Sequence, residues 1–361
     1  MLLSNESPDY AMYRALNSSR ILPADKHPGV RPLAAGETMM RLISACNMMQ
    51  TGNQATVACG NTQLCAGTRA GIEGNLHAVR AIWPQSSGWT IDDDGQLVED
   101  KLFTQPEEFE PPDPNAGTSR AADDPKIDRG ADPDATRSRF EDDVGFGQAL
   151  FDAKNAFNSA NRYLMLWNVR HRWNKASRFA FNRYKHHNIC YLRDDPGKPV
   201  YIILSKEGTI QGDVLGAKNY AVAMLPLAEN MRIAVPRTVQ PWFADDSASA
   251  GRARDNAACL KFLMEHGPRY GYFPSPEKSW YICKAKDEPA AIEAFSELNL
   301  PIRMTRGHNY LGGFIGSAET KELWVGEKIS VWTAAVENLS KIALKWPQTA
   351  YAGFTLVLQN E

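Results

Sequence analysis

Apolar residues in the last two-thirds of the chain alternate between strand-like and helix-like spacing. Residues 144–151 carry four large apolar side chains and favour a buried strand, and residues 200–204 read VYIIL, which favours a second strand. Helices are expected in three separate stretches, at residues 158–173, 214–231 and 253–266. A hairpin is expected at residues 243–247. A strand followed by helices, a hairpin and a further helix is the order expected of a split βαβ sheet.

The chain divides into three regions by composition. Residues 1–85 show helical patterns broken by the string DKHPGVRP, and residues 144–361 regain apolar periodicity. Between them, residues 86–143 are rich in Asp, Glu, Pro and Gly and hold few large apolar side chains. Because such a segment buries too little apolar surface to offset the entropy of ordering, we expect most of it to be a disordered insertion.

Charge is distributed unevenly along the chain. Residues 92–143 hold 17 acidic and 6 basic residues, so the rest of the chain is net basic although the total is -2. Residues 162–207 carry ten basic and three acidic residues, interleaved with aromatics as in RHRWNKASRFAFNRYKHH. A basic, aromatic-rich surface suits a polyanion such as nucleic acid. A solvated helix face is the alternative.

The spacing of the cysteines and the hydropathy of the chain indicate the cellular compartment in which the protein is expected. The six cysteines form no CxxC pair and no zinc-binding spacing, so we expect free thiols or small buried apolar residues in a reducing compartment. No apolar run approaches the roughly 20 residues of a membrane span. The N-terminus does not resemble a signal peptide. These features predict an intracellular protein without a membrane segment.

Three carboxylates are candidates for chemistry. Asp152 follows the predicted strand at residues 144–151, and Asp245 and Asp246 occupy the predicted hairpin turn. Taken singly, Asp152 could cap a helix and the hairpin acids could simply face water. If the hairpin pairs beside the strand, however, the acids converge, and cations must offset their repulsion. Two Mg²⁺ ions about 3.5–4 Å apart can support an in-line phosphoryl transfer.

Seven segments, in order, resemble the motifs of reverse transcriptases from non-LTR-type and related retroelements. The first two are similar to the fingers motifs of that family, and the other five to its catalytic, QGD-containing, Asp-Asp, fourth and primer-grip motifs. The segments are DKHPGVRPLAAGETMMRLI, NTQLCAGTRAGIEGNLHAV, LFDAKNAFN, EGTIQGDVLGAKNYAVAMLPL, WFADDSA, GYFPSPEKSW and NYLGGFIGS. They cover most of residues 20–320. The resemblance implies an RNA-directed DNA polymerase that uses an RNA template, a DNA or RNA primer and dNTPs.

The resemblance also implies roles at the reaction centre. Asp152, Asp245 and Asp246 would hold two Mg²⁺ or Mn²⁺ ions, and Lys278 would protonate the leaving pyrophosphate or neutralise its charge. For Lys278, the alternative is an ordinary surface lysine. The hairpin motif has Phe243 where the family usually has tyrosine, a change that loses only a hydroxyl.

Further positions would bind the incoming nucleotide and the primer. Phe157 would be the steric gate that rejects a 2′-hydroxyl, although ordinary core packing could also explain it. The remaining nucleotide-binding positions implied by the resemblance are Lys26, Arg31, Ala153, Gln211 and Gly212. For Lys26 and Arg31, a solvated loop is the alternative. The turn that holds the primer end would consist of Tyr310, Leu311 and Gly312.

The implied fold is α+β: a right-hand polymerase with fingers, a palm with an antiparallel sheet and helices, and a truncated thumb. The fingers would span residues 1–85 and part of 174–210, and the palm residues 144–307. Residues 308–361 would form the primer grip and the start of the thumb.

Departures from the family pattern leave other functions open. Val214 replaces a frequent proline after QGD, and the acidic insertion at residues 86–143 has no family counterpart. No endonuclease, integrase or RNase H segment is visible, which is typical of a fragment or a decayed copy. An inactive remnant that binds RNA or RNA–DNA hybrid is therefore an alternative to the polymerase. A two-metal nuclease is a further one, but it would not need the QGD and fingers segments.

Overall fold

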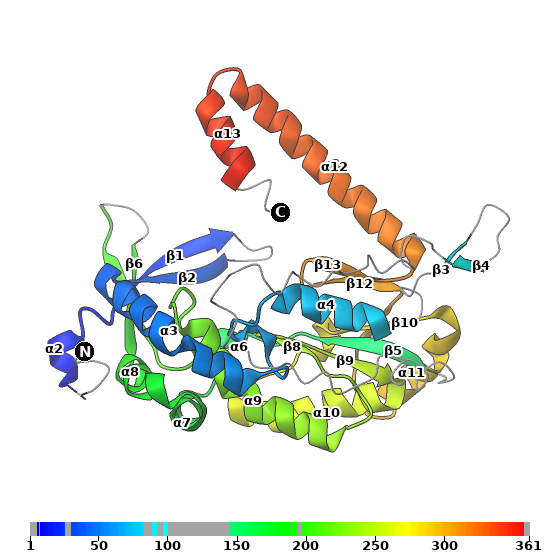
Figure 1. Ribbon diagram of the computed structural model, residues 1–361, viewed down its shortest axis with the longest axis horizontal. Coiled ribbons are helices and arrows are strands. Elements are labelled where there is room, and N and C mark those ends of the chain that lie inside the picture. The colour runs from blue at the N-terminus through cyan, green and yellow to red at the C-terminus, as the bar shows by residue number, and fades with distance from the viewer. Residues whose placement is uncertain are drawn as a thin grey trace, which may run out of the picture.

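A computed structural model describes residues 6, 8–25, 30–82, 89–91, 97–99, 145–193 and 197–356. The architecture is α+β, with helices around two mixed sheets (Figure 1). The predicted α+β class is therefore confirmed. None of the helices in the described part of the chain combines the length and apolar character that a membrane span requires.

The central sheet has five strands in the order β11-β10-β5-β9-β8. Their bounds are β5 Phe146–Phe151, β8 Trp242–Phe243, β9 Asp246–Arg252, β10 Trp280–Cys283 and β11 Arg303–Thr305. Strand β9 pairs antiparallel with both β5 and β8, and therefore separates two strands that run in the same direction. This arrangement is a split βαβ sheet, as the element order predicts. Strand β11 pairs parallel with β10, so the sheet is mixed and the expectation of an antiparallel sheet is wrong at this edge.

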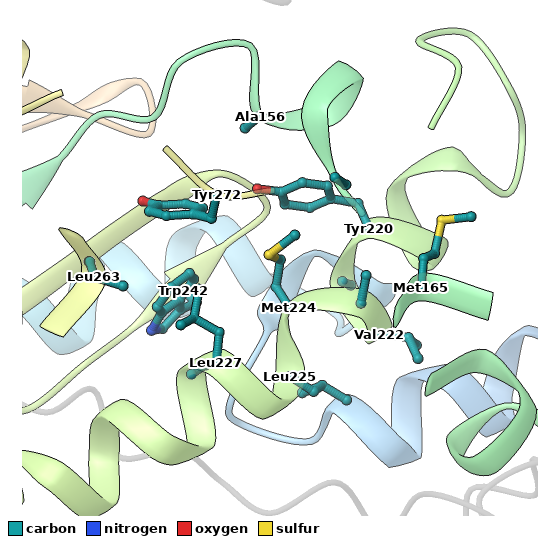
Figure 2. Close-up of a cluster of buried hydrophobic side chains, with 14 of the residues drawn as sticks. Ala156, Met165, Tyr220, Val222, Met224, Leu225, Leu227, Trp242, Leu263 and Tyr272 are labelled. Carbon is teal, nitrogen blue, oxygen red and sulfur yellow. The ribbon is translucent and has the colours of Figure 1, made fainter. Parts of the chain in front are cut away.

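Helices α9 (Gly216–Ala234) and α10 (Ala253–Tyr270) cover one face of this sheet (Figure 1). The core on this side combines the fully buried aromatic side chains of Tyr220, Trp242 and Tyr272 with aliphatic ones such as Leu227 (Figure 2). Burial of a side chain such as Leu227 stabilises the fold by about 1.5–3 kcal/mol. The predicted helices at residues 214–231 and 253–266 are thus confirmed, with slightly shifted ends.

A smaller cluster covers part of the opposite face. It joins Val79 of helix α4 (Gly71–Ile82) to Leu150 and Ala248 of the sheet. Tyr310 and Ile315 complete the cluster from the hairpin of strands β12 (Gly307–Tyr310) and β13 (Gly313–Gly316). Side chains alternate between faces along a strand, so residues of β5 and β9 that share the parity of Leu150 and Ala248 project to this side.

The second sheet has four strands in the order β2-β1-β6-β7. Their bounds are β1 Ser19–Asp25, β2 Val30–Gly36, β6 Asn188–Arg193 and β7 Val200–Ser205. Strand β7 confirms the prediction from VYIIL. Helices α2 (Tyr10–Tyr13), α3 (Thr38–Cys59), α7 (Arg162–Arg172) and α8 (Asn174–Tyr184) belong to the same half of the molecule (Figure 1).

The helix predicted at residues 158–173 begins later than expected. A short helix, α6 (Ala156–Ser159), ends before Ala160, and α7 starts after Asn161. The Asn161 side chain accepts hydrogen bonds from the backbone N–H groups of Tyr163 and Leu164 and so caps α7. The cap residue was visible in the sequence, but apolar periodicity alone did not reveal the break.

The basic, aromatic stretch is only partly a surface. Arg162 and Arg183 are buried, as are Trp173, Phe179 and Tyr184. The Arg162 guanidinium donates to the backbone carbonyls of His186, Glu207 and Gly208, so it organises the chain instead of facing solvent. Both interpretations from the sequence, a polyanion surface and a solvated helix face, therefore fail for these residues.

Helices α12 (Ala318–Ala343) and α13 (Pro347–Leu356) pack on each other and project away from the two sheets (Figure 1). Strands β3 (Trp89–Ile91) and β4 (Leu97–Glu99) form a short antiparallel pair within the acidic segment. The rest of residues 86–143, which we expect to be disordered, lies outside the described residues. All six cysteines are free thiols, as predicted.

Candidate active site at the end of strand β5

Strand pairing brings the three aspartates together. The register of β5 with β9 ends at the pair Phe151–Ser247, and Asp152 and Asp246 are the residues next to this last pair on the two segments. Asp245 lies in the two-residue turn between β8 and β9. The hairpin therefore pairs beside the strand, which is the condition under which the acids converge.

The aspartates lie on the face of the sheet that α9 and α10 do not cover. Asp152 and Asp246 share the parity of Leu150 and Ala248, which belong to the opposite cluster. Both aspartates are exposed, and Asp245 is half-buried. The site is therefore open to a ligand approaching from solvent.

The charges of Asp152 and Asp245 affect the protonation of Asp246. The pKa of Asp246 is raised to about 6, first because surrounding protein removes part of its hydration and then because Asp245 and Asp152 are like charges nearby. Asp246 nevertheless remains exposed to solvent. Clustered carboxylates of this kind are stabilised when a cation neutralises them.

The carboxylate oxygens of the three aspartates are the groups here that a metal ion would require. Carboxylate oxygens suit Mg²⁺, which is commonly held by one or two carboxylates, with waters and substrate phosphates filling the other positions. Within the described residues, no group of three or more His, Cys, Asp or Glu side chains is arranged as a ready metal site. Asp152, Asp245 and Asp246 therefore do not form a metal site of protein ligands alone in this structure.

The segment after β5 is held by residues 273–279. The Asp152 backbone N–H donates to Ser279 Oγ at 3.1 Å, and its carbonyl accepts from the Ser275 N–H at 2.8 Å. Ala153 forms an isolated antiparallel bridge with Pro274. These bonds extend the sheet beyond β5 and fix the backbone that carries Asp152.

The hairpin turn is supported from two sides. Tyr272 Oη lies 2.8 Å from Ser247 Oγ and 3.4 Å from the Asp245 carbonyl oxygen. From the other side, the buried Gln63 side chain bonds to both backbone groups of Ala244, at 2.8 and 3.0 Å. Ala244 has φ of 56°, a left-handed conformation that costs a non-glycine residue about 1–2 kcal/mol. External contacts therefore hold a turn that alanine alone would disfavour.

Phe157 has a defined environment beside the aspartates. Its ring stacks on that of Tyr220, with centroids 4.5 Å apart, and is only partly buried. The Phe157 carbonyl accepts a hydrogen bond from the Thr209 N–H at 2.7 Å. Phe157 is one of the partly buried residues that pack against the core, so this environment suits a ligand-facing ring and ordinary core packing alike.

The Gln211–Gly212 loop contacts strand β2. The Ala34 N–H donates to the Gln211 carbonyl at 2.8 Å, and a Cβ at residue 212 would lie 2.6 Å from the Ala34 carbonyl oxygen. Gly212 also has φ of 106°. Both the close approach and the positive φ therefore require glycine.

A buried ion pair anchors this loop. Arg183 Nε lies 3.2 Å from Asp213 Oδ2, and both side chains are 2% exposed. The Tyr184 hydroxyl donates to the same carboxylate oxygen at 2.5 Å, and Asp213 Oδ1 accepts from the Leu215 N–H. Asp213 thus connects α8 to the start of α9.

Arg183, Tyr184, Asp213 and Gln63 were not singled out from the sequence. Asp213 is the last residue of the QGD string. Its position beside Gln211 and Gly212 was therefore a signal in the sequence that could have marked it as a residue of this loop. Its partner lies 30 residues away in a stretch interpreted as surface, and Gln63 lies 181 residues from Ala244. No local spacing marks such contacts.

The other candidate positions are more dispersed. Arg31 is exposed in β2, where it pairs with Ala24 of β1, and Lys26 lies outside the described residues. Lys278 is exposed at the end of a 3₁₀ turn, Pro276–Lys278, just before β10.

The predicted turn at residues 310–312 exists, but its tyrosine points inward. Leu311 and Gly312 have φ of 49° and 80° and join β12 to β13. Tyr310 is buried, and its hydroxyl lies 3.3 Å from Asn75 Oδ1 of α4. The turn therefore leaves Leu311 half-buried and Gly312 exposed, while the Tyr310 ring fixes the hairpin to α4.

Comparison with known proteins gives matches of structure but not of sequence. No known protein family matches the chain, and no curated protein sequence matches it. The structure of telomerase from Candida albicans in complex with a TWJ fragment of telomeric RNA is similar, with a TM-score of 0.52 and 8% sequence identity. That match covers 86% of this chain and 47% of the telomerase chain.

A structure of apo telomerase from Candida tropicalis, truncated from its C-terminal domain, matches with a TM-score of 0.43 and 12% identity. This match covers 83% of the present chain and 53% of the Candida tropicalis chain. The present chain therefore spans about half the length of both telomerases. At this level of identity, the Candida albicans structure shows the fold alone. The chain thus shares its fold with the matched part of the Candida albicans telomerase.

Proposed function

We propose that the chain is an RNA-directed DNA polymerase that adds dNTPs to a primer by two-metal phosphoryl transfer. The observation that carries this proposal is the convergence of Asp152, Asp245 and Asp246 at the open end of a split βαβ sheet. The fold shared with telomerase supports it, as do the seven ordered segments that resemble reverse transcriptases of retroelements.

The aspartates and Lys278 would serve the chemical step. Two Mg²⁺ or Mn²⁺ ions, when bound, would neutralise charge on the attacking and leaving oxygens. Asp152 and Asp245 would hold these ions, with Asp246 beside them. Lys278, exposed just before β10, would neutralise or protonate the leaving pyrophosphate.

A second group of residues would position the nucleotide. The backbone at Ala153 would contact the triphosphate, and the partly exposed Phe157 ring would exclude a 2′-hydroxyl. Gln211 and Gly212 would line the nascent base pair. Lys26 and Arg31 would bind the triphosphate from the β1–β2 side, Arg31 through two parallel hydrogen bonds.

The fold can be interpreted as a right hand. Residues 1–85 with part of 174–210 would be the fingers, residues 144–307 the palm, and residues 308–361 the primer grip and a short thumb. The Leu311–Gly312 turn would contact the primer end, near the aspartates. An RNA template paired with its primer would be bound through its backbone rather than its sequence.

Replacement of Phe157 by alanine should increase ribonucleotide incorporation relative to deoxyribonucleotide incorporation by about 10- to 100-fold. The physical reason is that removing the ring opens space beside the sugar C2′ without disturbing the aspartates. Competition between dNTP and NTP in single-nucleotide extension measures the ratio. Phe157→Tyr, which keeps the ring, is the matched control and should retain selectivity. Unchanged sugar selectivity in Phe157→Ala would remove the steric-gate assignment.

The polymerase proposal is tested by supplying one dNTP at a time to a DNA primer annealed to RNA. With Mg²⁺ present, we expect the primer to lengthen only with the dNTP complementary to the next template base. Extension with every dNTP alike would indicate untemplated transfer and would contradict the proposal.

An inactive remnant that binds RNA or RNA–DNA hybrid is the second candidate. It is favoured by helix α12, none of whose residues is buried, because a thumb that packs so little would hold a duplex weakly. In that case the wild-type chain would bind the hybrid, measured by fluorescence anisotropy, and would extend it with neither Mg²⁺ nor Mn²⁺.

A further inference from the structure

The β8–β9 turn is held by a side chain from a distant part of the sequence. Gln63 Nε2 donates to the Ala244 carbonyl at 3.0 Å, and Gln63 Oε1 accepts from the Ala244 N–H at 2.8 Å. The amide therefore satisfies both backbone groups of the residue that immediately precedes Asp245. Gln63 is fully buried, so water does not compete for either bond.

Gln63 is itself fixed to helix α3. Its backbone N–H donates to the Cys59 carbonyl at 3.3 Å, at the end of that helix. Just after it, a 3₁₀ turn, Leu64–Ala66, is held by Thr56, whose hydroxyl donates to the Ala66 carbonyl at 2.6 Å. The amide thus reaches the hairpin from a rigid support, and a displacement of α3 would be transmitted to the turn.

The conformation of Ala244 shows why support is needed. A φ of 56° is one that hairpin turns usually give to glycine. Alanine adopts it here while both of its backbone polar groups bond to Gln63. Since the turn sets the direction of Asp245 and the start of β9, losing the amide would allow the turn to relax and the aspartate to move.

We infer that Gln63 is a positioning residue that holds Asp245 and Asp246 in place to bind metal ions together with Asp152. This inference rests on the proposed function for its chemistry, because it assumes that the aspartates bind metal. It adds a residue outside the carboxylate cluster on which the geometry of that cluster depends. Side chains that orient metal ligands typically change metal affinity or activity by about 10- to 100-fold when replaced.

Gln63→Met tests the inference, because methionine keeps the length and volume of the side chain and removes both hydrogen bonds. We expect Mn²⁺ affinity, measured by electron paramagnetic resonance of the free ion, to fall by about 10-fold or more. The amide of Ala244, followed by hydrogen–deuterium exchange of the peptide at residues 241–248, should lose protection. Primer extension should show a lower kcat with unchanged affinity for the hybrid.

Two further variants separate positioning from general stability. Gln240→Met makes the same change at another buried glutamine, whose amide donates to the Val235 carbonyl at 2.9 Å, away from the turn. It should leave Mn²⁺ affinity unchanged. Adding Ala244→Gly to Gln63→Met should restore part of the affinity, because glycine adopts a positive φ without support.

Mn²⁺ affinity that is equal in wild type and a folded Gln63→Met would overturn the inference. So would a loss of the same size in Gln240→Met, or a double variant with no recovery. If the wild-type chain binds Mn²⁺ but extends no primer, the proposed function fails while the metal-binding and exchange measurements still decide the role of Gln63.

Discussion

Replacement of Asp152 by asparagine is expected to slow primer extension by on the order of 10³-fold or more. Metal ions supply several kcal/mol of stabilisation to the charge that develops in phosphoryl transfer, and each 1.4 kcal/mol or so changes the rate tenfold. Asparagine keeps the shape of Asp152 and removes its charge, so an ion held between β5 and the β8–β9 turn would be bound less firmly. Single-turnover extension with saturating hybrid measures the loss.

The fold should tolerate this change. Asp152 is exposed, and the bonds that place it, to Ser275 and Ser279, use its backbone. Thermal unfolding and hybrid affinity should therefore remain close to those of wild type. Asp255→Asn, the same substitution in the first turn of α10, is the matched control and should retain activity. Full activity in Asp152→Asn would exclude this aspartate as a metal ligand.

Replacement of Asp213 by asparagine should have the largest effect on stability, about 3–5 kcal/mol. The substitution would leave the Arg183 guanidinium buried without its counter-charge, and the Tyr184 hydroxyl would lose a charged acceptor. Because Asp213 also connects α8 to the start of α9, the adjacent Gln211–Gly212 loop should loosen. Urea unfolding followed by tryptophan fluorescence measures the change in free energy.

A half-exposed ion pair is the control for the buried pair of Arg183 and Asp213. Arg172 and Glu229 form a bidentate pair in which the side chains are 33% and 37% exposed. Glu229→Gln should cost about 1 kcal/mol or less, since solvent screens such pairs and hydrates the remaining charge. Similar losses in Asp213→Asn and Glu229→Gln would contradict the importance assigned to the buried pair.

The central sheet and its carboxylates could be predicted because local patterns determine them. A buried strand, a hairpin and intervening helices indicate a split βαβ sheet. Pairing of the hairpin with β5 then brings Asp152 and Asp246 next to the last pair, Phe151–Ser247, and the side-chain period of two directs both to one face of the sheet. The break before α7 was also accessible in principle, because Asn161 is a preferred cap residue.

The contacts that support the site could not be predicted in this way. Gln63 reaches Ala244 across 181 residues, and Arg183 pairs with Asp213 only because α8 packs beside the start of α9. Arg183 belongs to the basic stretch interpreted as surface from its composition. A charge is buried only where a partner offsets the cost, and no local pattern points to Asp213 as that partner. Tertiary packing decides these positions, whereas periodicity and spacing describe one element at a time.

Primer extension on an RNA template, with wild type and Asp245→Ala compared at equal folded concentration, tests most directly whether the converging aspartates form a polymerase site. With Mg²⁺ or Mn²⁺ and all four dNTPs, we expect wild type to produce full-length DNA and the variant to produce none, although both bind the hybrid. Equal extension by the two proteins would contradict the assignment of the site, and no extension by a wild-type chain that binds the hybrid would contradict the polymerase function.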